Sequence, residues 1–447
     1  MAAPSPASGT GAAQWFGHPR GLSTLFFTEM WERFSYYGMR AFLILYMTAS
    51  VANGGLGFDD KHAASVYGNY VGAVWLTPIV GGLIADRLLG QYRSVLLGGS
   101  IIALGHFTLA FKTLSTFYAG LVLIVIGTGL LKPNVSTIVG SLYDEKDARR
   151  DAGFSVFYMG INLGAFIGPL IAGGLAQKVN WHLGFAMAGI GMVFGLIQYV
   201  VGRRHLEPGL ARLAARPVNP ASAAIDSGPP RFTAQEWKRI AAIFVLFLFA
   251  SIFWGAYEQA GSTLNLFGDR YTQNTVFGFA YPSSWYVSVQ AFFVITLSPA
   301  FAWLWIKLGP REPSVPSKFA LALLFGGLAF LLLVPAGSIA QSGAGIKVSP
   351  LWLVGAYFIE EWGELCLSPV GLSAVTKLAP VRMVSLMMGV FFLSNSLGNK
   401  LAGWTAGFFS TMPLSQLFGA VSAVCLVSAV IMFVLIRPVK KLMGGVH

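Results

Sequence analysis

Charged and phenolic side chains recur at helical spacing in the first long apolar stretch of the sequence. In an α-helix, residues three or four positions apart lie on one face. The residues on this face are Glu29, Arg33, Tyr36 and Arg40, flanked by Glu32 and Tyr37. Glu29 precedes Arg33 by four residues, which is the favourable order for an ion pair within a helix. Carboxylates in such a setting can exchange protons, and arginine can grip a carboxylate with two hydrogen bonds.

Further charged residues interrupt the later apolar stretches. They are the basic residues Lys132 and Lys400 and the acidic residues Glu258, Glu360, Glu361 and Glu364. A charge at the centre of a bilayer costs about 2.5–3.5 kcal/mol, so these side chains must face one another or a water-filled cavity. Intramembrane charges usually mark a functional site, and the alternative is that they form buried ion pairs that only fix helix packing.

The elements that carry these residues are long apolar helices. Hydrophobic residues make up 55% of the 447-residue chain and charged residues only 11%, whereas soluble proteins contain about 25% charged residues. A membrane span needs about 20 predominantly apolar residues. The sequence predicts twelve such helices, at 22–50, 60–88, 93–111, 116–140, 153–178, 184–203, 237–268, 280–308, 318–338, 350–378, 384–411 and 415–437.

A polar stretch rich in proline, alanine and arginine separates these helices into two groups of six. The predicted organisation is a disordered N-terminal tail at 1–20, a six-helix bundle at 21–203, a cytoplasmic linker at 204–235, a second six-helix bundle at 236–438 and a cytoplasmic tail at 439–447. Two six-helix halves are a common plan among transporters.

The basic residues of the loops predict the orientation of the helices. With the N-terminus in the cytoplasm, 21 of the 30 lysines and arginines fall inside and 5 outside, and the other four lie within helices. This is the bias of the positive-inside rule. We therefore expect a multi-pass protein of the plasma membrane, the inner membrane in a bacterium, with both termini cytoplasmic. The bias also explains the net charge of +12 without a nucleic-acid partner.

Other classes of protein fit the sequence less well. Strands of a transmembrane β-barrel alternate apolar and polar residues, whereas the apolar stretches here are long and continuous. Cys366 and Cys425 have no metal-ligand spacing, and the apolar stretches contain no histidine pair at ligand spacing and no nucleophile-elbow motif. We therefore expect no metal, no cofactor and no enzymatic activity.

Motifs along nearly the whole chain are those of one transporter family. Glu29-x-x-Glu32-Arg33-Phe34-x-Tyr36-Tyr37 resembles the first-helix motif of the proton-dependent oligopeptide transporter family, a branch of the major facilitator superfamily. Similar to the family, in the same order, are GGLIADRLLGQYR (81–93), GTGLLKPNVSTIVG (127–140), FSVFYMGINLGAFIGP (154–169), FWGAYEQAGSTLNLF (253–267), GELCLSPVGLSAVTKLAP (363–380) and MMGVFFLSNSLGNKLAG (387–403). The resemblance implies an all-α integral membrane protein with the major facilitator superfamily fold, about twelve transmembrane helices in two six-helix bundles.

The resemblance also implies roles for side chains of both halves. Arg40 and Lys132 would bind the carboxylate of a peptide, because a guanidinium matches a carboxylate bidentately. Glu364 would bind the ammonium group, helped by Asn162 and Gln290. The other implied substrate-binding residues are Tyr36, Tyr37, Trp75, Tyr158, Trp254, Glu258, Trp285, Ser368 and Phe391. For each aromatic residue, ordinary helix packing is the alternative. Trp75, Gln290 and Phe391 depart from the residues that the family most often has, so the preference for substrate side chains stays open.

Proton coupling requires carboxyl groups whose proton affinity changes with conformation. The resemblance assigns this role to Glu29, Glu32, Arg33, Lys132 and Glu258. It further implies two ion pairs across the outer mouth of the protein, Arg40–Glu258 and Lys132–Glu364. Each of these pairs would join the two halves, as a gate requires.

The function that the resemblance implies is proton-coupled import of di- and tripeptides by alternating access, with the proton as the coupling ion. The alternative is a proton-coupled transporter of another small solute, such as nitrate, an amino acid conjugate or a drug-like compound. We expect small peptides, protons and the lipid bilayer as partners, no nucleic acid, and a monomer.

Overall fold

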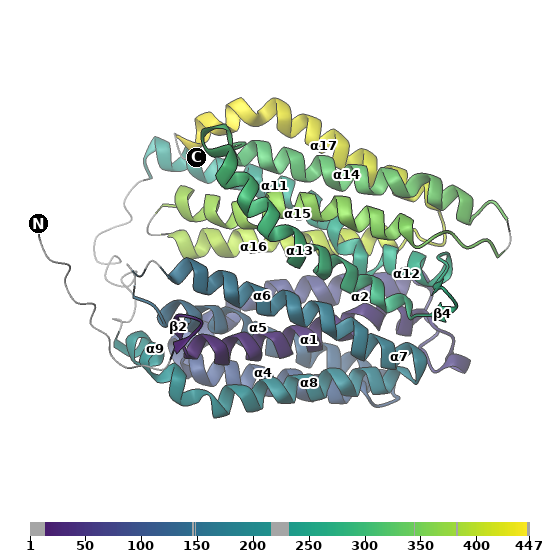
Figure 1. The fold of residues 1–447 in the computed structure, drawn as a ribbon, viewed down its shortest axis with the longest axis horizontal. Helices are drawn as coiled ribbons and strands as arrows, with labels where there is room; N and C mark the ends of the chain where they lie inside the picture. Colours follow the sequence, from purple (N-terminus) through teal and green to yellow (C-terminus); the bar gives the residue numbers. More distant parts are fainter. Residues whose placement is uncertain are drawn as a thin grey trace, which may run out of the picture.

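Long, roughly parallel helices make up most of the protein (Figure 1). The computed structural model describes residues 14–144, 147, 149–215, 232–343, 345–380 and 383–444. Within these residues, eight helices are long and apolar enough to cross a membrane. Two further long helices, α1 (Gly21–Thr48) and α15 (Leu351–Leu378), carry most of the intramembrane charges predicted from the sequence and are therefore less apolar.

The first half of the described chain contains six long helical segments. They are α1; α2 (Asp60–Leu76), continued by α3 (Pro78–Ile84) and the π-helical turn η2 (Ala85–Leu89); α4 (Gln91–Leu109); α5 (Leu114–Ser141); α6 (Arg150–Gly168), continued by η3 (Pro169–Gly173) and α7 (Gly174–Lys178); and α8 (Trp181–Val201). Shorter elements of this half are the strands β1 (Gln14–Trp15) and β2 (His18–Pro19), the turn η1 (Val51–Asn53) and the helix α9 (Arg203–Ala215).

Six more long segments form the second half of the described chain. They are α11 (Ala234–Tyr257), continued by η4 (Glu258–Gly261) and α12 (Thr263–Arg270); α13 (Tyr286–Leu308), preceded by η5 (Ser283–Trp285) and followed by η6 (Gly309–Arg311); α14 (Val315–Ala340); α15; α16 (Val384–Ala406); and α17 (Leu414–Met443). A small hairpin, β3 (Thr275–Val276) with β4 (Phe279–Ala280), joins α12 to η5. The twelve segments confirm the helices predicted from the apolar stretches.

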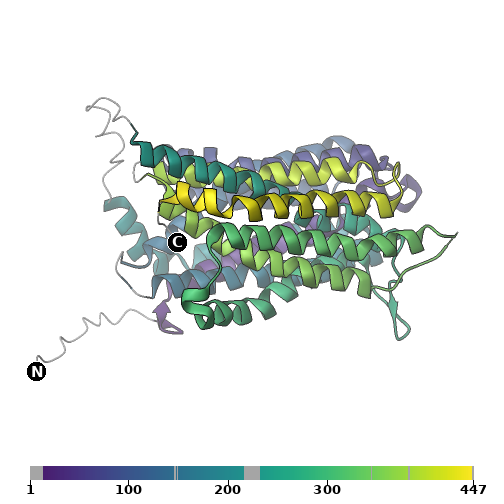
Figure 2. The ribbon, with the colours of Figure 1, turned by 90° about the horizontal axis from the view of Figure 1, so that it is seen from above.

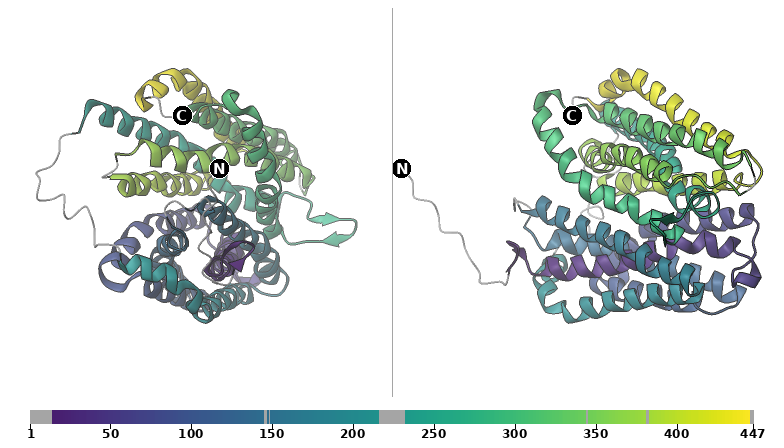
Figure 3. Two further views of the ribbon diagram at one scale, coloured as in Figure 1. Left: turned by 60° about the vertical axis from the view of Figure 1, so that its left-hand side comes forward. Right: turned by 45° about the vertical axis from the view of Figure 1, so that its right-hand side comes forward.

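Two bundles are visible in the ribbon, with the purple to teal helices of the first half on one side and the green and yellow helices of the second half on the other (Figure 3). The strand β2, the helix α9 and the end of α17 lie at one end of the molecule, and α12 and β4 lie at the other (Figure 1). Figure 2 shows α17 running along the length of the second half. We call these ends the α9 end and the α12 end.

Polar contacts between the two bundles gather toward the α12 end. Gln177 of α7 donates to Ser283 Oγ at 2.8 Å and to Asp269 Oδ1 at 3.2 Å. The indole of Trp285 donates to the Leu170 carbonyl at 3.1 Å. Within the described residues, every hydrogen bond and ion pair that joins the bundles uses the α12-side part of α1, α2 or α6–α7. The bundles are therefore tied together at the α12 end.

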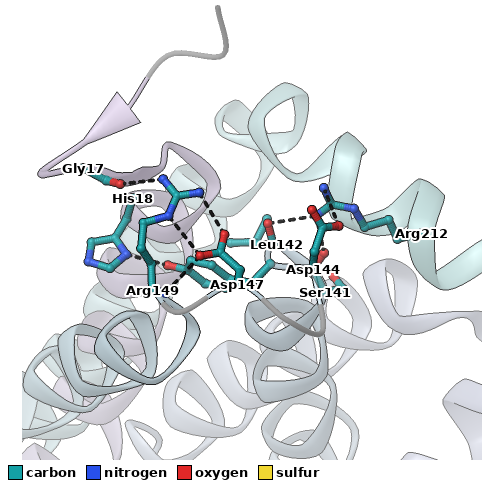
Figure 4. Close-up of polar contacts among 9 residues, drawn as sticks. Gly17, His18, Ser141, Leu142, Asp144, Asp147, Arg149 and Arg212 are labelled. Carbon is teal, nitrogen blue, oxygen red and sulfur yellow. Dashed lines mark hydrogen bonds and ion pairs between the residues drawn. The ribbon is translucent and has the colours of Figure 1, made fainter. Parts of the chain in front are cut away.

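The described part of the expected N-terminal tail is folded. β1 pairs with β2 in an antiparallel hairpin, and the ring of Trp15 packs on Phe26 of α1 at 5.5 Å. Arg149 donates to the Gly17 carbonyl at 3.0 Å and to the Asp147 carboxylate (Figure 4). The side-chain and backbone hydrogen bonds from Arg149 hold the pKa of Asp147 at about 2. Residues 1–13 lie outside the described residues.

The expected linker also begins as a helix, α9, that packs against the α9 end of the first bundle. Arg212 donates to the carbonyls of Ser141 and Leu142 at 3.0 and 2.9 Å and lies 3.3 Å from Asp144 (Figure 4). These carbonyls belong to the last turn of α5, where intrahelical donors are missing. The guanidinium of Arg212 supplies the missing donors. The rest of the linker, 216–231, lies outside the described residues.

Close packing between α1 and α6 generates a stability prediction. A Cβ at Gly164 would collide with the Met30 carbonyl oxygen and lie 2.9 Å from Arg33 Cβ. Gly164→Ala should therefore force the two helices apart and destabilise the fold by about 1–3 kcal/mol. Thermal unfolding of the detergent-purified protein measures this. The matched control is Gly419→Ala, where the nearest atom is 3.9 Å away. Equal melting temperatures for the two variants would contradict the prediction.

Candidate functional site

The predicted charge stripe on α1 is buried in the first bundle. Arg33 Nη2 donates to Glu32 Oε1 at 2.6 Å, Arg33 Nε donates to Glu32 Oε2, and Nε lies 3.4 Å from Glu29 Oε1. The residues Glu29, Glu32 and Arg33 are at most 3% exposed. Oε2 of Glu29 has no hydrogen-bond partner among the described residues. One guanidinium beside two carboxylates leaves one negative charge uncompensated. A proton or a second cation can neutralise this charge.

Lys132 of α5 is the second cation near these carboxylates. Its Nζ lies 3.2 Å from the ring centroid of Trp75 on α2, a cation–π contact. Lys132 is also close enough to Glu29 and Glu32 for electrostatic attraction. The ion pair expected between Lys132 and Glu364 is not formed between these two described residues. Lys132 instead lies over Trp75, where Glu32 and Glu29 of its own bundle and Glu258 of the other act on it electrostatically.

The other expected ion pair, Arg40–Glu258, joins the two bundles. Arg40 Nη2 contacts Glu258 Oε2, and Arg40 Nε donates to the Tyr67 hydroxyl at 2.6 Å. Arg40 is 6% and Glu258 4% exposed. Glu258 stands where α11 gives way to the 3₁₀ turn η4, so the pair fixes a break in the helix to α1. Tyr67 was not among the residues expected from the sequence.

A second ion pair joins the two bundles at the α12 end. Arg270 of α12 donates to both oxygens of Asp60 at the start of α2, each at 2.7 Å. The hydroxyl of Ser410 donates to the same carboxylate. Asn265 Nδ2 donates to the Ala41 carbonyl at 2.7 Å. Neither Asp60 nor Arg270 belongs to the motifs that led to the expected site, because both lie at helix ends where charged residues are common.

Three carboxyl groups on α15 face the interior of the second bundle. Glu360, Glu361 and Glu364 are 1%, 0% and 5% exposed. Gln290 Nε2 donates to Glu360 Oε2 at 3.1 Å, and the Tyr257 hydroxyl donates to Glu361 Oε1 at 2.9 Å. Gln290 was expected to help Glu364, and the structure instead places it on Glu360. Among the described residues, no lysine or arginine forms an ion pair with any of the three.

Glu364 lies where residues of both bundles meet. The hydroxyls of Tyr158 on α6 and Ser368 on α15 are close to its carboxylate. Asn162, one turn from Tyr158, donates to the Tyr158 carbonyl at 3.0 Å. Oε2 of Glu364 has no hydrogen-bond partner within the described chain. The structure thus brings together Glu364, Tyr158, Asn162 and Ser368, as expected from the sequence.

The expected aromatic residues divide into two groups. Tyr36 and Tyr37 pack edge to face at 5.1 Å beside the guanidiniums of Arg33 and Arg40. Trp254 packs on Tyr257 at 5.3 Å, and its indole nitrogen has no partner among the described residues. These rings lie next to the charged groups, where they can contact a ligand.

Trp285 and Phe391 lie apart from this cluster. Trp285 borders an apolar hollow of about 370 Å³ at the α12 end, together with Phe166, Leu170, Tyr281 and Phe292. Phe391 is buried with Phe319 and would meet a Cβ at Gly371. Ordinary packing therefore accounts for Phe391 in this conformation.

A family model described as the POT family matches residues 92–208 and 231–435, which is more than half of the chain. The chain belongs to the POT family. This confirms the resemblance to proton-dependent oligopeptide transporters, and the major facilitator superfamily fold that it implied.

Relatives of the chain match it over nearly their whole length. "Uncharacterized transporter YclF" of Bacillus subtilis is 41% identical, and the match covers 97% of this chain and 96% of that protein. "Peptide transporter YePEPT" of Yersinia enterocolitica is 37% identical over 97% of both chains. A "Di-/tripeptide transporter" of Lactococcus lactis subsp. cremoris is 38% identical over 97% of this chain and 98% of that one.

Solved structures of the family share the fold. A peptide transporter of the POT family in complex with alafosfalin is 40% identical and superposes with a TM-score of 0.88, covering 97% of this chain and 98% of that chain. A POT family transporter in complex with 5-aminolevulinic acid is 32% identical, with a TM-score of 0.88 over 96% of this chain and 99% of that chain.

The Arg40–Glu258 pair generates a test by a double mutant. Removing one partner of a buried ion pair leaves an uncompensated charge and costs about 3–5 kcal/mol, whereas removing both is far less costly. Arg40→Met should therefore lower the melting temperature of the purified POT family protein markedly. Arg40→Met combined with Glu258→Gln should recover most of the loss. A single variant as stable as the wild type would show that the pair does not hold the bundles together.

Proposed function

We propose that this protein is a proton-coupled symporter that imports di- and tripeptides by alternating access. The observation that carries the proposal is the division of charge between the bundles. The first bundle presents Arg40 and Lys132, and the second presents Glu364 with no basic partner among the described residues. A peptide is a zwitterion, so its two ends match these opposite charges. The relatives named as peptide transporters support this substrate class.

The contacts between the bundles support a specific conformation. Ion pairs and hydrogen bonds of the described residues tie the bundles together at the α12 end. The excess of basic residues in the loops favours a cytoplasmic position for the α9 end. We therefore assign this arrangement to the inward-facing state. We further propose a monomer in the bacterial inner membrane with both termini cytoplasmic, no catalytic activity and no cofactor besides the proton.

Proton coupling follows from the incomplete pairing on α1. Arg33 serves Glu29 and Glu32 together, and Lys132 lies near both. When the bundles rock, a carboxylate that loses its cation binds a proton, because an isolated charge is costly in the bilayer. A proton moving inward also gains about 2.3 kcal/mol per 100 mV of membrane potential. One such proton can drive a zwitterionic peptide against its gradient.

The deciding experiment uses purified protein in liposomes with an acidic exterior. Accumulation of an unchanged, labelled dipeptide that stops when an uncoupler removes the pH gradient is expected. Equal uptake with and without the pH gradient would overturn proton coupling. No dipeptide uptake at all would overturn the substrate class.

The structure bound to 5-aminolevulinic acid favours a second candidate substrate. That compound carries an amine and a carboxylate, the same two charges as a peptide, at a different spacing. Competition of unlabelled 5-aminolevulinic acid against labelled dipeptide separates the two. Stronger competition by 5-aminolevulinic acid than by dipeptides would make a small amino acid derivative the substrate.

Substitutions on α1 should separate coupling from binding. Glu32→Gln and Arg33→Ala disrupt the buried cluster without removing Lys132 or Glu364. Each variant should lose proton-driven accumulation and keep exchange of internal for external dipeptide, because exchange needs no net proton movement. Both activities are measured in the same liposomes. Concentrative uptake at the wild-type level by either variant would remove this cluster from the coupling mechanism.

The two ends of the peptide should be read by opposite bundles. A charge-assisted hydrogen bond is worth about 1.5–3 kcal/mol, so losing one weakens binding by roughly one to two decades. Glu364→Gln should lose the preference for a free amino terminus, and Lys132→Gln the preference for a free carboxyl terminus. Calorimetry with one dipeptide and its two blocked forms measures both. A Glu364→Gln protein that still rejects the amino-blocked form as strongly as the wild type would show that the ammonium is held elsewhere.

A further inference from the structure

Glu361 is a fully buried carboxyl group that has no role in the site described above. It is 0% exposed, and its Oε2 has no hydrogen-bond partner among the described residues. The carboxylates of α1 and η4, by contrast, are paired with Arg33 or Arg40. The titratable groups of described residues that interact electrostatically with Glu361 are Tyr257, Glu360, Glu364 and Tyr158, none of them a cation. An ionised carboxylate is unfavourable in such a place, and a protonated one is not.

A hydrogen bond to the side chain of Glu361 connects it to the Arg40–Glu258 pair, called here the gate pair. Its donor, Tyr257, is the last residue of α11, and the next residue is Glu258, which pairs with Arg40. The chain leaves the α-helical path at this point and continues as the 3₁₀ turn η4. A movement that separates Glu258 from Arg40 therefore also moves Tyr257 against Glu361.

On its other side Glu361 is next to the candidate ammonium site. Glu364 follows it by three residues on α15, so the two side chains lie on the same face of the helix. α15 runs from the α12 end toward the α9 end, which makes Glu364 the carboxyl group nearer the cytoplasm. The groups thus form one line, from the gate pair through Tyr257, Glu361 and Glu364 to Tyr158 of the opposite bundle.

We propose that Glu361 is a proton carrier of the transport cycle, which holds a proton while the α12 end is closed and passes it to the cytoplasmic side along Glu364. The inference rests on the proposed function, because it concerns the protons of that symport. It adds a proton-binding group in the second bundle to those of α1. The proton enters when the gate pair opens and Tyr257 withdraws, and no covalent bond is made or broken.

Glu360 provides a matched control on the same helix. It is equally buried, but its partner is the amide of Gln290 on α13, and it acts on Cys425 of α17. Its hydrogen bond is therefore with α13 and not with Tyr257, although Glu258, Tyr257 and Glu361 are close enough to interact with it electrostatically. Glu360→Gln removes one buried carboxyl group from the same helix and leaves the hydrogen bond from Tyr257 to Glu361 in place.

The test compares wild type, Glu361→Gln and Glu360→Gln in liposomes. The number of protons per dipeptide is obtained from the membrane potential at which net uptake reverses. If wild-type protein took up dipeptide without moving any protons, the proposed symport itself would be refuted. With the wild type coupled, Glu361→Gln should exchange dipeptide within twofold of the wild type, yet move about one proton fewer. Its maximal accumulation at a one-unit pH gradient should fall about tenfold. Glu360→Gln should keep the wild-type proton number.

An unchanged proton number in Glu361→Gln, or an equal loss in Glu360→Gln, would overturn the proposal. If Glu361→Gln does not fold, Tyr257→Phe decides, because it removes the hydrogen bond and keeps the carboxyl group. This variant should shift the pH of half-maximal concentrative uptake by about half a unit or more, since the phenol acts on the proton of Glu361. A purely structural role of Tyr257 would leave that pH unchanged, which would also overturn the proposal.

Discussion

A charge that is buried between these helices must find its counter-charge there, and this constraint governs the arrangement of the site. The effective cost of burying an ion is several kcal/mol, which only close pairing or hydrogen bonding offsets. Arg33 meets the constraint within one helix by binding Glu29 and Glu32, whereas Arg40 meets it across the bundles by binding Glu258. The second solution ties the position of one bundle to that of the other.

Closure at the α12 end therefore has an electrostatic origin. Opening that end separates Arg40 from Glu258 and Arg270 from Asp60, so four charges lose their partners together. Water must then solvate these charges, or protons must neutralise the carboxylates among them. The break of α11 at Glu258 allows this end to move without unfolding the rest of the helix, because η4 and α12 form separate short segments. Movement of the bundles and protonation are thus two aspects of one event.

The sequence predicted the helices and the paired charges because both leave a periodic or compositional signal. Apolar stretches defined the twelve segments, the charged stripe of the first helix led to Arg40, and the motif at 253–267 led to Glu258. Tyr67 and Tyr257 left no such signal, since a tyrosine in an apolar stretch is usually part of ordinary packing. The partner of Gln290 depends on how α13 and α15 are rotated against each other, which no local pattern specifies. The hairpin at 14–19 was missed because its stability comes from Trp15 packing on Phe26 of α1.

The balance of charges in the site argues for protonation independently of any single residue. Its carboxyl groups among the described residues are Glu29, Glu32, Glu258, Glu360, Glu361 and Glu364, and the cations beside them are Arg33, Arg40 and Lys132. A zwitterionic peptide adds one charge of each sign, so it leaves this excess of negative charge unchanged. Protons can remove this excess, because a buried neutral carboxyl group costs far less than a buried carboxylate. The first bundle is close to balanced, and the excess falls on the second bundle. A transport cycle that neutralises the site must therefore bring protons to the second bundle as well as to the first-helix motif.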